Sequence, residues 1–282
     1  MESPRLSTPQ LVAAMPEIVA IARAAGALVM ETYERDGRDA TSATPSTAKS
    51  DGSPLTEADT RSHACIVAAL SARFPAVPIV SEEDATDATA PATLLSGCWL
   101  VDPLDGTKEF LKRSGEFTVN IAYVEDGIPL LGVVVAPVSG HAWYAGPSGA
   151  WRDGPDGSIQ LAVRTHIASE PLRIVASRDH TGAAVRALLA RLPDAETVAV
   201  GSSLKFCRVA EGAADLYFRD GPTMPWDTAA AQAVLVQAGG GVFGLDGRPL
   251  RYRELRTANA PFVAVGDCAI PWRTWMDGGA TT

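Results

Sequence analysis

The sequence predicts a layered α/β fold. Residues 1–170 contain two helical patterns followed by several short apolar strands, and strands alternate with helices through residues 171–282. Such alternation is typical of helices that pack on sheets. With 282 residues, 46% of them hydrophobic, the chain is large enough for a sizeable core. We expect the two parts to form one compact unit.

The first helix is predicted over residues 8–35, where apolar side chains recur at helical spacing. Thr8 would cap it and Pro9 would occupy its first turn. Pro16 is expected to kink or restart it, because proline has no backbone N–H to donate. The charged residues of this stretch, and Pro16 itself, argue against a membrane span.

The segment that follows, residues 36–53, contains almost no apolar side chain. It predicts either a plain loop or a flap that closes over a site. A helical repeat returns over residues 56–74. The pair Asp126-Gly127 interrupts the apolar stretch 118–137 and is typical of a tight hairpin turn. Strands are predicted at 77–80, 98–102, on both sides of that turn, at 141–146 and at 149–154.

The second half carries the alternating elements. Helices are predicted at 183–192, 202–212 and 227–240, the last of which ends in glycines suited to a helix C-terminus. Strands are predicted at 172–177, 197–200, 214–219 and 262–266.

Charge and cysteine content narrow the class of protein. The formal net charge of −9 argues against a nucleic-acid polymer or an anionic membrane surface as partner, since these require a basic face. The four cysteines are far apart and form no CxxC pair, which is typical of reduced thiols in a cytosolic protein. The four histidines are scattered, so a zinc site is not expected. The first residues lack the basic region of a signal peptide, and we expect a cytoplasmic location.

The run WLVDPLDGTKEF (99–110) indicates chemistry at the end of a strand. Asp102 and Asp105 flank a proline-containing turn, and the carbonyl of Leu104 lies between them. Two carboxylates and a carbonyl are oxygen ligands that Mg²⁺ prefers. Gly106 would let the backbone approach a ligand closely, and N–H groups from Thr107 onwards would hold a phosphate. An Asp-rich turn that caps itself is the structural alternative.

Other carboxylates also lie at the ends of predicted elements. Glu82 follows one strand within VPIVSEED, Asp59 opens a helix within LTEAD, and Asp227 opens another within MPWDTAAAQA. Each has a structural alternative, as a surface acidic run or as an acid that favours a helix N-terminus. Because α/β folds build their sites at element ends, we expect these groups to meet and to hold two or three cations.

These motifs, in this order, resemble the inositol monophosphatase superfamily of Mg²⁺-dependent, lithium-sensitive phosphatases over roughly residues 10–267. Within it the likeness is greatest to the 3′(2′),5′-bisphosphate nucleotidases of the bacterial CysQ type. It is carried by KSDGSPLTEAD (49–59), VDPLDGTKEFLKRSGEFTVNIA (101–122), GSSLKFCRVAEGAADLY (201–217) and GPTMPWDTAA (221–230). The resemblance implies an αβαβα sandwich of the sugar-phosphatase type.

The resemblance also implies residue roles. Asp59, Glu82 and Thr107 would surround the nucleophilic water, and the amides of Gly106 and Thr107 would hold the phosphate. The implied Mg²⁺ ligands are Glu82, Asp102, the Leu104 carbonyl, Asp105 and Asp227. The implied contacts to the nucleotide or its second phosphate are Ser202, Lys205, Arg219 and, near the base, His180. Further basic residues that could offset substrate charge are Lys49, Lys108, Lys112 and Arg113.

The implied activity is Mg²⁺-dependent hydrolysis of the 3′-phosphate of adenosine 3′,5′-bisphosphate to AMP and phosphate, which would clear a by-product of sulfur metabolism. Inositol or sugar phosphates are the alternative substrates, and a non-catalytic nucleotide or metal sensor is the alternative class. The expected partner is a small phosphorylated nucleotide, and relatives of this kind include homodimers.

Overall fold

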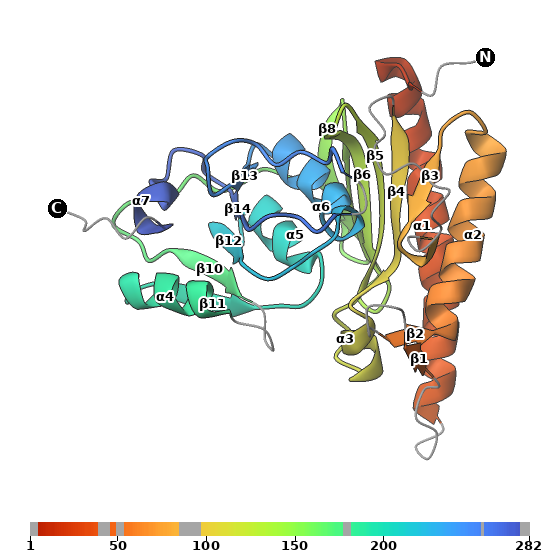
Figure 1. Ribbon diagram of the computed structural model, residues 1–282, viewed down its shortest axis with the longest axis horizontal. Coiled ribbons are helices and arrows are strands. Elements are labelled where there is room, and N and C mark those ends of the chain that lie inside the picture. Colours follow the sequence, from red (N-terminus) through yellow and green to blue (C-terminus); the bar gives the residue numbers. More distant parts are fainter. Residues whose placement is uncertain are drawn as a thin grey trace.

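The structure, a computed structural model, describes residues 5–38, 46–48, 54–84, 97–176, 182–254 and 257–276. Two long helices cover one face of a large sheet, further helices lie between that sheet and a smaller one, and two short helices cover the far face of the smaller sheet (Figure 1). The predicted layered α/β fold is therefore confirmed, with layers in the order αβαβα.

The first layer and the large sheet come from the N-terminal part of the chain. The helices are α1 (Thr8–Arg38), α2 (Glu57–Arg73), the 3₁₀ turn η1 (Glu82–Asp84) and α3 (Thr107–Leu111). The strands are β1 (Ser46–Ala48), β2 (Pro54–Thr56), β3 (Ile79–Ser81), β4 (Cys98–Asp105), β5 (Thr118–Glu125), β6 (Ile128–Ala136), β7 (His141–Gly146), β8 (Gly149–Gly154) and β9 (Gly157–Gln160).

The remaining elements form the inner helices, the smaller sheet and its cover. The helices are α4 (Ala183–Arg191), α5 (Leu204–Ala210), α6 (Pro225–Gln237) and α7 (Trp272–Met276). The strands are β10 (Arg173–Ala176), β11 (Glu196–Ala199), β12 (Leu216–Arg219), β13 (Gly241–Gly244) and β14 (Phe262–Val265).

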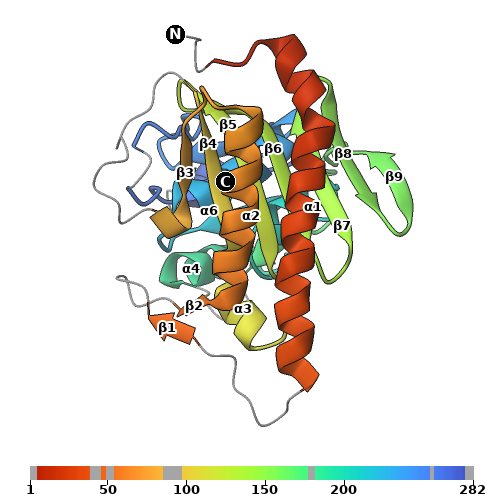
Figure 2. The same cartoon turned by 90° about the vertical axis from the view of Figure 1, so that its right-hand side faces the viewer.

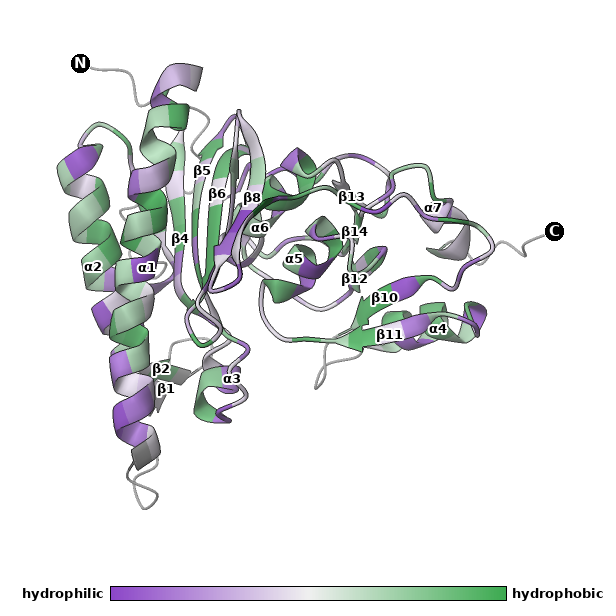
Figure 3. Cartoon of the chain, turned by 180° about the vertical axis from the view of Figure 1, so that it is seen from behind, coloured by the Kyte–Doolittle hydropathy of each residue, from purple (hydrophilic) through white to green (hydrophobic). Residues whose placement is uncertain are grey.

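Helices α1 and α2 lie side by side on the large sheet (Figure 2). Hydrophilic and hydrophobic stretches alternate along both helices (Figure 3), as expected for helices with one buried face. By length and composition α1 could cross a membrane. However, residues such as Ile18, Ala22 and Val29 are fully buried against the sheet, so α1 belongs to the core.

The large sheet has seven strands in the order β3-β4-β5-β6-β7-β8-β9, which is the order of the chain. All neighbours are antiparallel except β3 and β4. The parallel pair is important for the site, because it brings the carboxyl ends of β3 and β4 to the same edge of the sheet. Glu82, which follows β3, therefore lies beside Asp102 of β4.

Helix α6 lies at the centre of the hydrophobic core between the two sheets. It contacts β4, β5, β6 and β7 of the large sheet, and it also contacts α5 and β13. Its small residues allow this close approach, and Ala229, Ala230 and Ala231 are almost fully buried. The smaller sheet has five strands in the order β11-β10-β12-β14-β13, with β14 antiparallel to both of its neighbours.

The structure differs from the sequence prediction in several places. Helix α1 begins at Thr8 itself and continues through Pro16 without a break, so the predicted restart is wrong. The predicted loop at 36–53 contains the end of α1 and strand β1, which pairs with β2; residues 39–45 and 49–53 lie outside the described part. Strands β9 and β13 and helix α7 were not predicted.

Candidate active site

The run DPLDG forms an irregular end to β4. Asp102 still pairs with the neighbouring strand β5, but the register shifts between Asp102 and Asp105. One Asp102 carboxylate oxygen accepts a hydrogen bond of 3.0 Å from the amide of Leu104, which closes the turn over Pro103. Gly106 has φ +90°, a left-handed conformation that suits glycine. The turn thereby directs the two carboxylates and the start of α3 toward the same region.

Asp59 connects the start of α2 to this turn. Its Oδ2 accepts hydrogen bonds from the amide of Thr56 at 2.8 Å and from the Thr56 hydroxyl at 2.6 Å. Its Oδ1 lies 3.3 Å from the hydroxyl of Thr107, which lies equally close to the Leu104 carbonyl oxygen. Asp59 is fully buried. A capping box therefore holds a buried carboxylate in contact with the predicted catalytic threonine.

The remaining carboxylates converge on Asp102, although they come from separate elements. Burial raises the pKa of Asp102 well above its usual value, and the charges of Glu82, Asp105 and Asp227 raise it further. Burial likewise raises the pKa of Asp227, with Asp105 as the next largest cause, while the amide of Met224 opposes the shift. Each group thus experiences the others as nearby negative charge.

This donor set fits a hard divalent cation. Among the described residues, no three His, Cys, Asp or Glu side chains already lie in a ready-made coordinating arrangement. Even so, the charges of Glu82 and Asp105 act together on Asp102 and Asp227 and raise the pKa of both, and buried carboxylates so crowded are normally paired with a cation. Carboxylate and carbonyl oxygens are the ligands of Mg²⁺.

A cavity of about 580 Å³ opens beside the carboxylates. Asp105, Ser202, Lys205 and Arg219 line it, together with Lys108. A smaller cavity of about 100 Å³ shares most of these residues and reaches Asp227. Asp105, Lys205 and Arg219 thus line both cavities, and the volume of the larger one is in the range of small-molecule sites.

Lys205 is a buried cation in this cavity. It is 7% exposed, and its ammonium donates a hydrogen bond of 2.8 Å to the carbonyl of Ser202. Burial lowers its pKa to about 8, although Asp105 acts in the opposite direction. Arg219 lies at the end of β12 and donates to the carbonyls of Gly221 and Pro222, which fixes its guanidinium at the cavity wall.

Four predicted basic or binding residues are not placed at the cavity, and one of them, Lys112, is exposed and does not line it. His180 and Lys49 lie outside the described residues. The Arg113 guanidinium lies 3.9 Å from the centre of the Tyr33 ring and donates to the Tyr33 carbonyl at 2.7 Å. Arg113 therefore holds the C-terminal part of α1, and the expectation that it offsets substrate charge is not supported.

Three buried residues that contact Asp105 were not predicted from the sequence, namely Thr118, Asn120 and Ser203. Asn120 and Ser203 are almost fully buried and form hydrogen bonds to Asp105. The available signal was an asparagine in the otherwise apolar centre of strand β5, where Val119 and Ile121 flank it. A buried polar side chain in a strand requires a partner.

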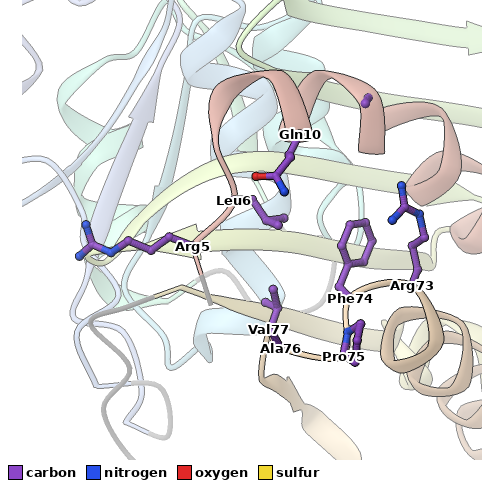
Figure 4. A pocket seen from close by; sticks show the side chains of 9 residues that line it. Arg5, Leu6, Gln10, Arg73, Phe74, Pro75, Ala76 and Val77 are labelled. Carbon is purple, nitrogen blue, oxygen red and sulfur yellow. The ribbon is translucent and has the colours of Figure 1, made fainter. Parts of the chain in front are cut away.

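A second cavity, of about 480 Å³, lies at the opposite end of α2 from Asp59 (Figure 4). Arg5, Arg73 and Phe74 are among the residues that line it. Both guanidinium groups are paired with carboxylates, Arg73 with Glu17 and Arg5 with Asp126. The cavity therefore offers no uncompensated charge for a phosphorylated ligand.

Comparison with known proteins gives a consistent result. The model of the inositol monophosphatase family matches residues 13–273. The chain is 43% identical to 3′(2′),5′-bisphosphate nucleotidase CysQ of Escherichia coli (strain K12), over 84% of this chain and 93% of the relative. It is 38% identical to the protein of the same name from Haemophilus influenzae, over 80% and 85% of the two chains.

Solved structures resemble this fold over most of their length. CysQ from Bacteroides thetaiotaomicron, a bacterial member of the inositol monophosphatase family, superposes with a TM-score of 0.74 at 35% identity and covers 92% of this chain and 97% of its own. An IMPase from Thermotoga maritima gives a TM-score of 0.72 at 23% identity, covering 89% and 91%, a likeness that shows the fold alone.

Proposed function

The chain belongs to the inositol monophosphatase family, and from this premise we propose that it is a 3′(2′),5′-bisphosphate nucleotidase. It would hydrolyse the 3′-phosphate of adenosine 3′,5′-bisphosphate to AMP and phosphate. The observation that carries the proposal is that the cationic residues Lys205 and Arg219 line the same two cavities as Asp105, and that the smaller of these cavities also reaches Asp227. The named relatives at 38–43% identity support the same substrate class.

Mg²⁺ is the proposed cofactor, with two or three ions in the site. The residues that would hold it are Glu82, Asp102, the Leu104 carbonyl, Asp105 and Asp227. When bound, Mg²⁺ neutralises charge on the phosphoryl oxygens and lowers the pKa of water. Without a cation the charges of Glu82 and Asp105 oppose the ionisation of Asp102 and Asp227, which supports a resident metal.

The proton that leaves the attacking water has a defined acceptor in the chain. The Thr107 hydroxyl lies 3.3 Å from Asp59 Oδ1, so it can accept from water while it donates to Asp59. Three hydrogen bonds reach Asp59 and fix the direction of its carboxyl group. Thr107 and Asp59 thus orient the water, and Glu82 lies at the same edge of the sheet.

The phosphate and the nucleotide would be held by groups of opposite charge. The amides of Gly106 and Thr107 begin α3 and point to the phosphoryl group in this proposal. Ser202, Lys205 and Arg219 would contact the second phosphate and the nucleoside, because they line the cavity next to Asp105. Arg is well suited to bidentate phosphate contacts, and Lys205 supplies a point charge.

The experiment that tests the function is a side-by-side assay of adenosine 3′,5′-bisphosphate and inositol monophosphate with the same enzyme and saturating Mg²⁺. We expect kcat/KM to be higher for the nucleotide, because inositol monophosphate has a single phosphate and lacks the second one that Lys205 and Arg219 would contact. A higher kcat/KM for inositol monophosphate would contradict the substrate assignment. Binding without turnover of either compound would indicate the sensor alternative.

Finer properties belong to the same proposal. They are inhibition by lithium, a role in sulfur metabolism, a cytoplasmic location and assembly as a homodimer. The burial of α1 in the core supports a protein that is not anchored through this helix.

A further inference from the structure

Asn120 and Ser203 connect the two halves of the site. Asn120 belongs to strand β5 of the large sheet, and Ser203 directly precedes α5 in the C-terminal half. We propose that this pair is a positioning device, which holds Asp105 and the start of α6 at the spacing that cation binding requires. The inference rests on the proposed function, because it assigns the device to the Mg²⁺ ligands of that function.

The contacts form one continuous bridge. The Asn120 amide nitrogen lies 3.0 Å from the Ser203 hydroxyl, and that hydroxyl donates to the backbone carbonyl of Asp227 at 2.6 Å. The backbone amide of Ser203 donates to Asp105 Oδ2 at 2.7 Å, and the Asn120 amide nitrogen lies 3.4 Å from the same oxygen. Two proposed ligands from opposite halves are therefore joined through a pair of neutral side chains.

The direction of these hydrogen bonds is determined by the number of protons available. A serine hydroxyl has a single proton, and here it is donated to the Asp227 carbonyl. The Ser203 oxygen must then accept from Asn120, whose NH₂ group is the only part of that side chain able to donate. A flipped Asn120 amide would direct its oxygen at the Asp105 carboxylate, which is repulsive. The asparagine NH₂ group thus supplies both donors that the bridge needs, one to Ser203 and one to Asp105.

The bridge leaves one face of Asp105 available. Within the described part of the chain, Ser203, Asn120 and Thr118 all direct their donors to Oδ2 of Asp105. Oδ1 is then the oxygen left to bind a cation. Because Asp227 is the third residue of α6, fixing its carbonyl also fixes the first turn of the helix that carries its carboxylate.

The backbone at Ser202 shows that this arrangement is held under strain. Ser202 has φ +47°, a left-handed conformation that residues other than glycine seldom adopt. Its hydroxyl lies 3.0 Å from that of Thr118, and the amide of the preceding Gly201 donates to Glu116 at 2.9 Å. Contacts to the large sheet therefore keep the turn in the conformation that directs the Ser203 amide to Asp105.

The test is calorimetric titration of chelator-treated protein with Mg²⁺. We expect Ser203→Ala and Asn120→Ala each to raise the Kd for Mg²⁺ by about 10-fold or more, as is typical when a residue that orients a metal ligand is lost. The double variant should bind no more weakly than the weaker single variant, because both residues act through one bridge. For Asn120→Ala the Mg²⁺ concentration that gives half-maximal activity should rise in parallel, with little change in nucleotide KM.

Tyr252→Phe is the matched control. In the wild type, the Tyr252 hydroxyl is buried and forms hydrogen bonds to Thr228 and Gln232, which lie on α6 as Asp227 does. Tyr252→Phe should lower Tm without changing the Kd for Mg²⁺. If both bridge variants kept the wild-type Kd for Mg²⁺, or if Tyr252→Phe lost as much affinity as they do, the positioning role would be wrong. The proposed function would still stand. Absence of Mg²⁺ binding by the wild type would overturn the proposed function as well. Ser203→Ala, which removes one oxygen, carries the test if Asn120→Ala does not fold.

Discussion

At the residue scale, the surroundings of Asp102 strongly oppose its ionisation. It is 1% exposed, and burial together with three neighbouring carboxylates raises its pKa. Asp102→Asn should therefore reduce kcat/KM for the nucleotide more than about 100-fold. Mutating a residue that only orients a metal ligand typically costs up to about 100-fold in activity, and mutating the ligand itself should cost more. Steady-state kinetics with increasing Mg²⁺ measure this effect.

The same substitution should leave the fold intact. Because Asn carries no charge, it removes repulsion with Glu82, Asp105 and Asp227, and the metal-free variant should melt at or above the wild-type Tm. Near-wild-type kcat at saturating Mg²⁺ would show that Asp102 is not a metal ligand. A large loss of Tm without metal would show instead that Asp102 is mainly structural.

Lys205 gives a prediction about pH. Burial lowers its pKa to about 8, so in the free enzyme it is charged below that pH and neutral above it. We expect kcat/KM for the nucleotide to fall as pH rises through about 8, because kcat/KM reports the titration of the free enzyme. Lys205→Met should have a lower kcat/KM at pH 7 and should lack this descending step. An identical alkaline step in the variant would assign the step to another group.

Site residues were predictable from the sequence where the side chain itself would bind the metal or act on the water. Asp59, Asp102, Asp105 and Asp227 are carboxylates at element ends, and the structure brings their charges or contacts together. The partner of Asn120 was not predictable, because Ser203 is 83 positions away and the contact depends on how the two halves pack. Arg113 was misassigned for a similar reason, since nothing local reveals the Tyr33 ring beneath it.

At the element scale, the position of α6 depends on its contact with β6 at Gly132. A β-carbon at Gly132 would lie 2.2 Å from the Ala230 carbonyl oxygen and 2.8 Å from the Ala233 side chain. Gly132→Ala should therefore push α6 from the sheet and destabilise the protein by about 1–3 kcal/mol, as overpacking of a core does. It should also weaken Mg²⁺ binding, because Asp227 begins that helix. Chemical denaturation and calorimetry measure the two effects.

Gly26→Ala is the control for this glycine. Its β-carbon would lie 3.2 Å or more from the Pro137 side chain, and Gly26 is in α1 on the opposite face of the large sheet. Alanine is favoured over glycine within a helix by about 1 kcal/mol, which offsets the tighter contact. A Gly132→Ala variant as stable as Gly26→Ala would show that α6 has room to move.

Element types were largely predictable, whereas their limits and edges were not. The hairpin at Asp126-Gly127 follows from residues that tolerate positive φ, and both residues adopt it, at 51° and 75°. Pro16 misled the prediction because α1 is held by its buried face, and this packing exceeds the loss of a single hydrogen bond. Strand β9 has an exposed sequence without a strand pattern and is defined by its pairing with β8.

At the scale of the whole molecule, the packing of the layers brings four carboxylates close together. Asp102 and Asp105 belong to strand β4 of the large sheet, Glu82 directly follows strand β3, and Asp227 comes from helix α6 in the layer between the sheets. Layer packing buries two of these groups and raises their pKa, so the metal-free protein carries a repulsive centre between its two halves. A cation that joins both layers should therefore stabilise the entire molecule as well as the site.

Mg²⁺ binding should therefore raise the melting temperature of the protein. A ligand that binds only the folded state contributes about 2.7 kcal/mol at 100 times its Kd, which corresponds to roughly 5 °C in Tm for a chain of this size. Mg²⁺ added to chelator-treated protein at pH 7.5 should raise Tm by this amount, as measured by scanning calorimetry. Asp102→Asn should lose most of the increase. An equal rise produced by NaCl at matched ionic strength would mean that screening alone, and no bound cation, relieves the repulsion.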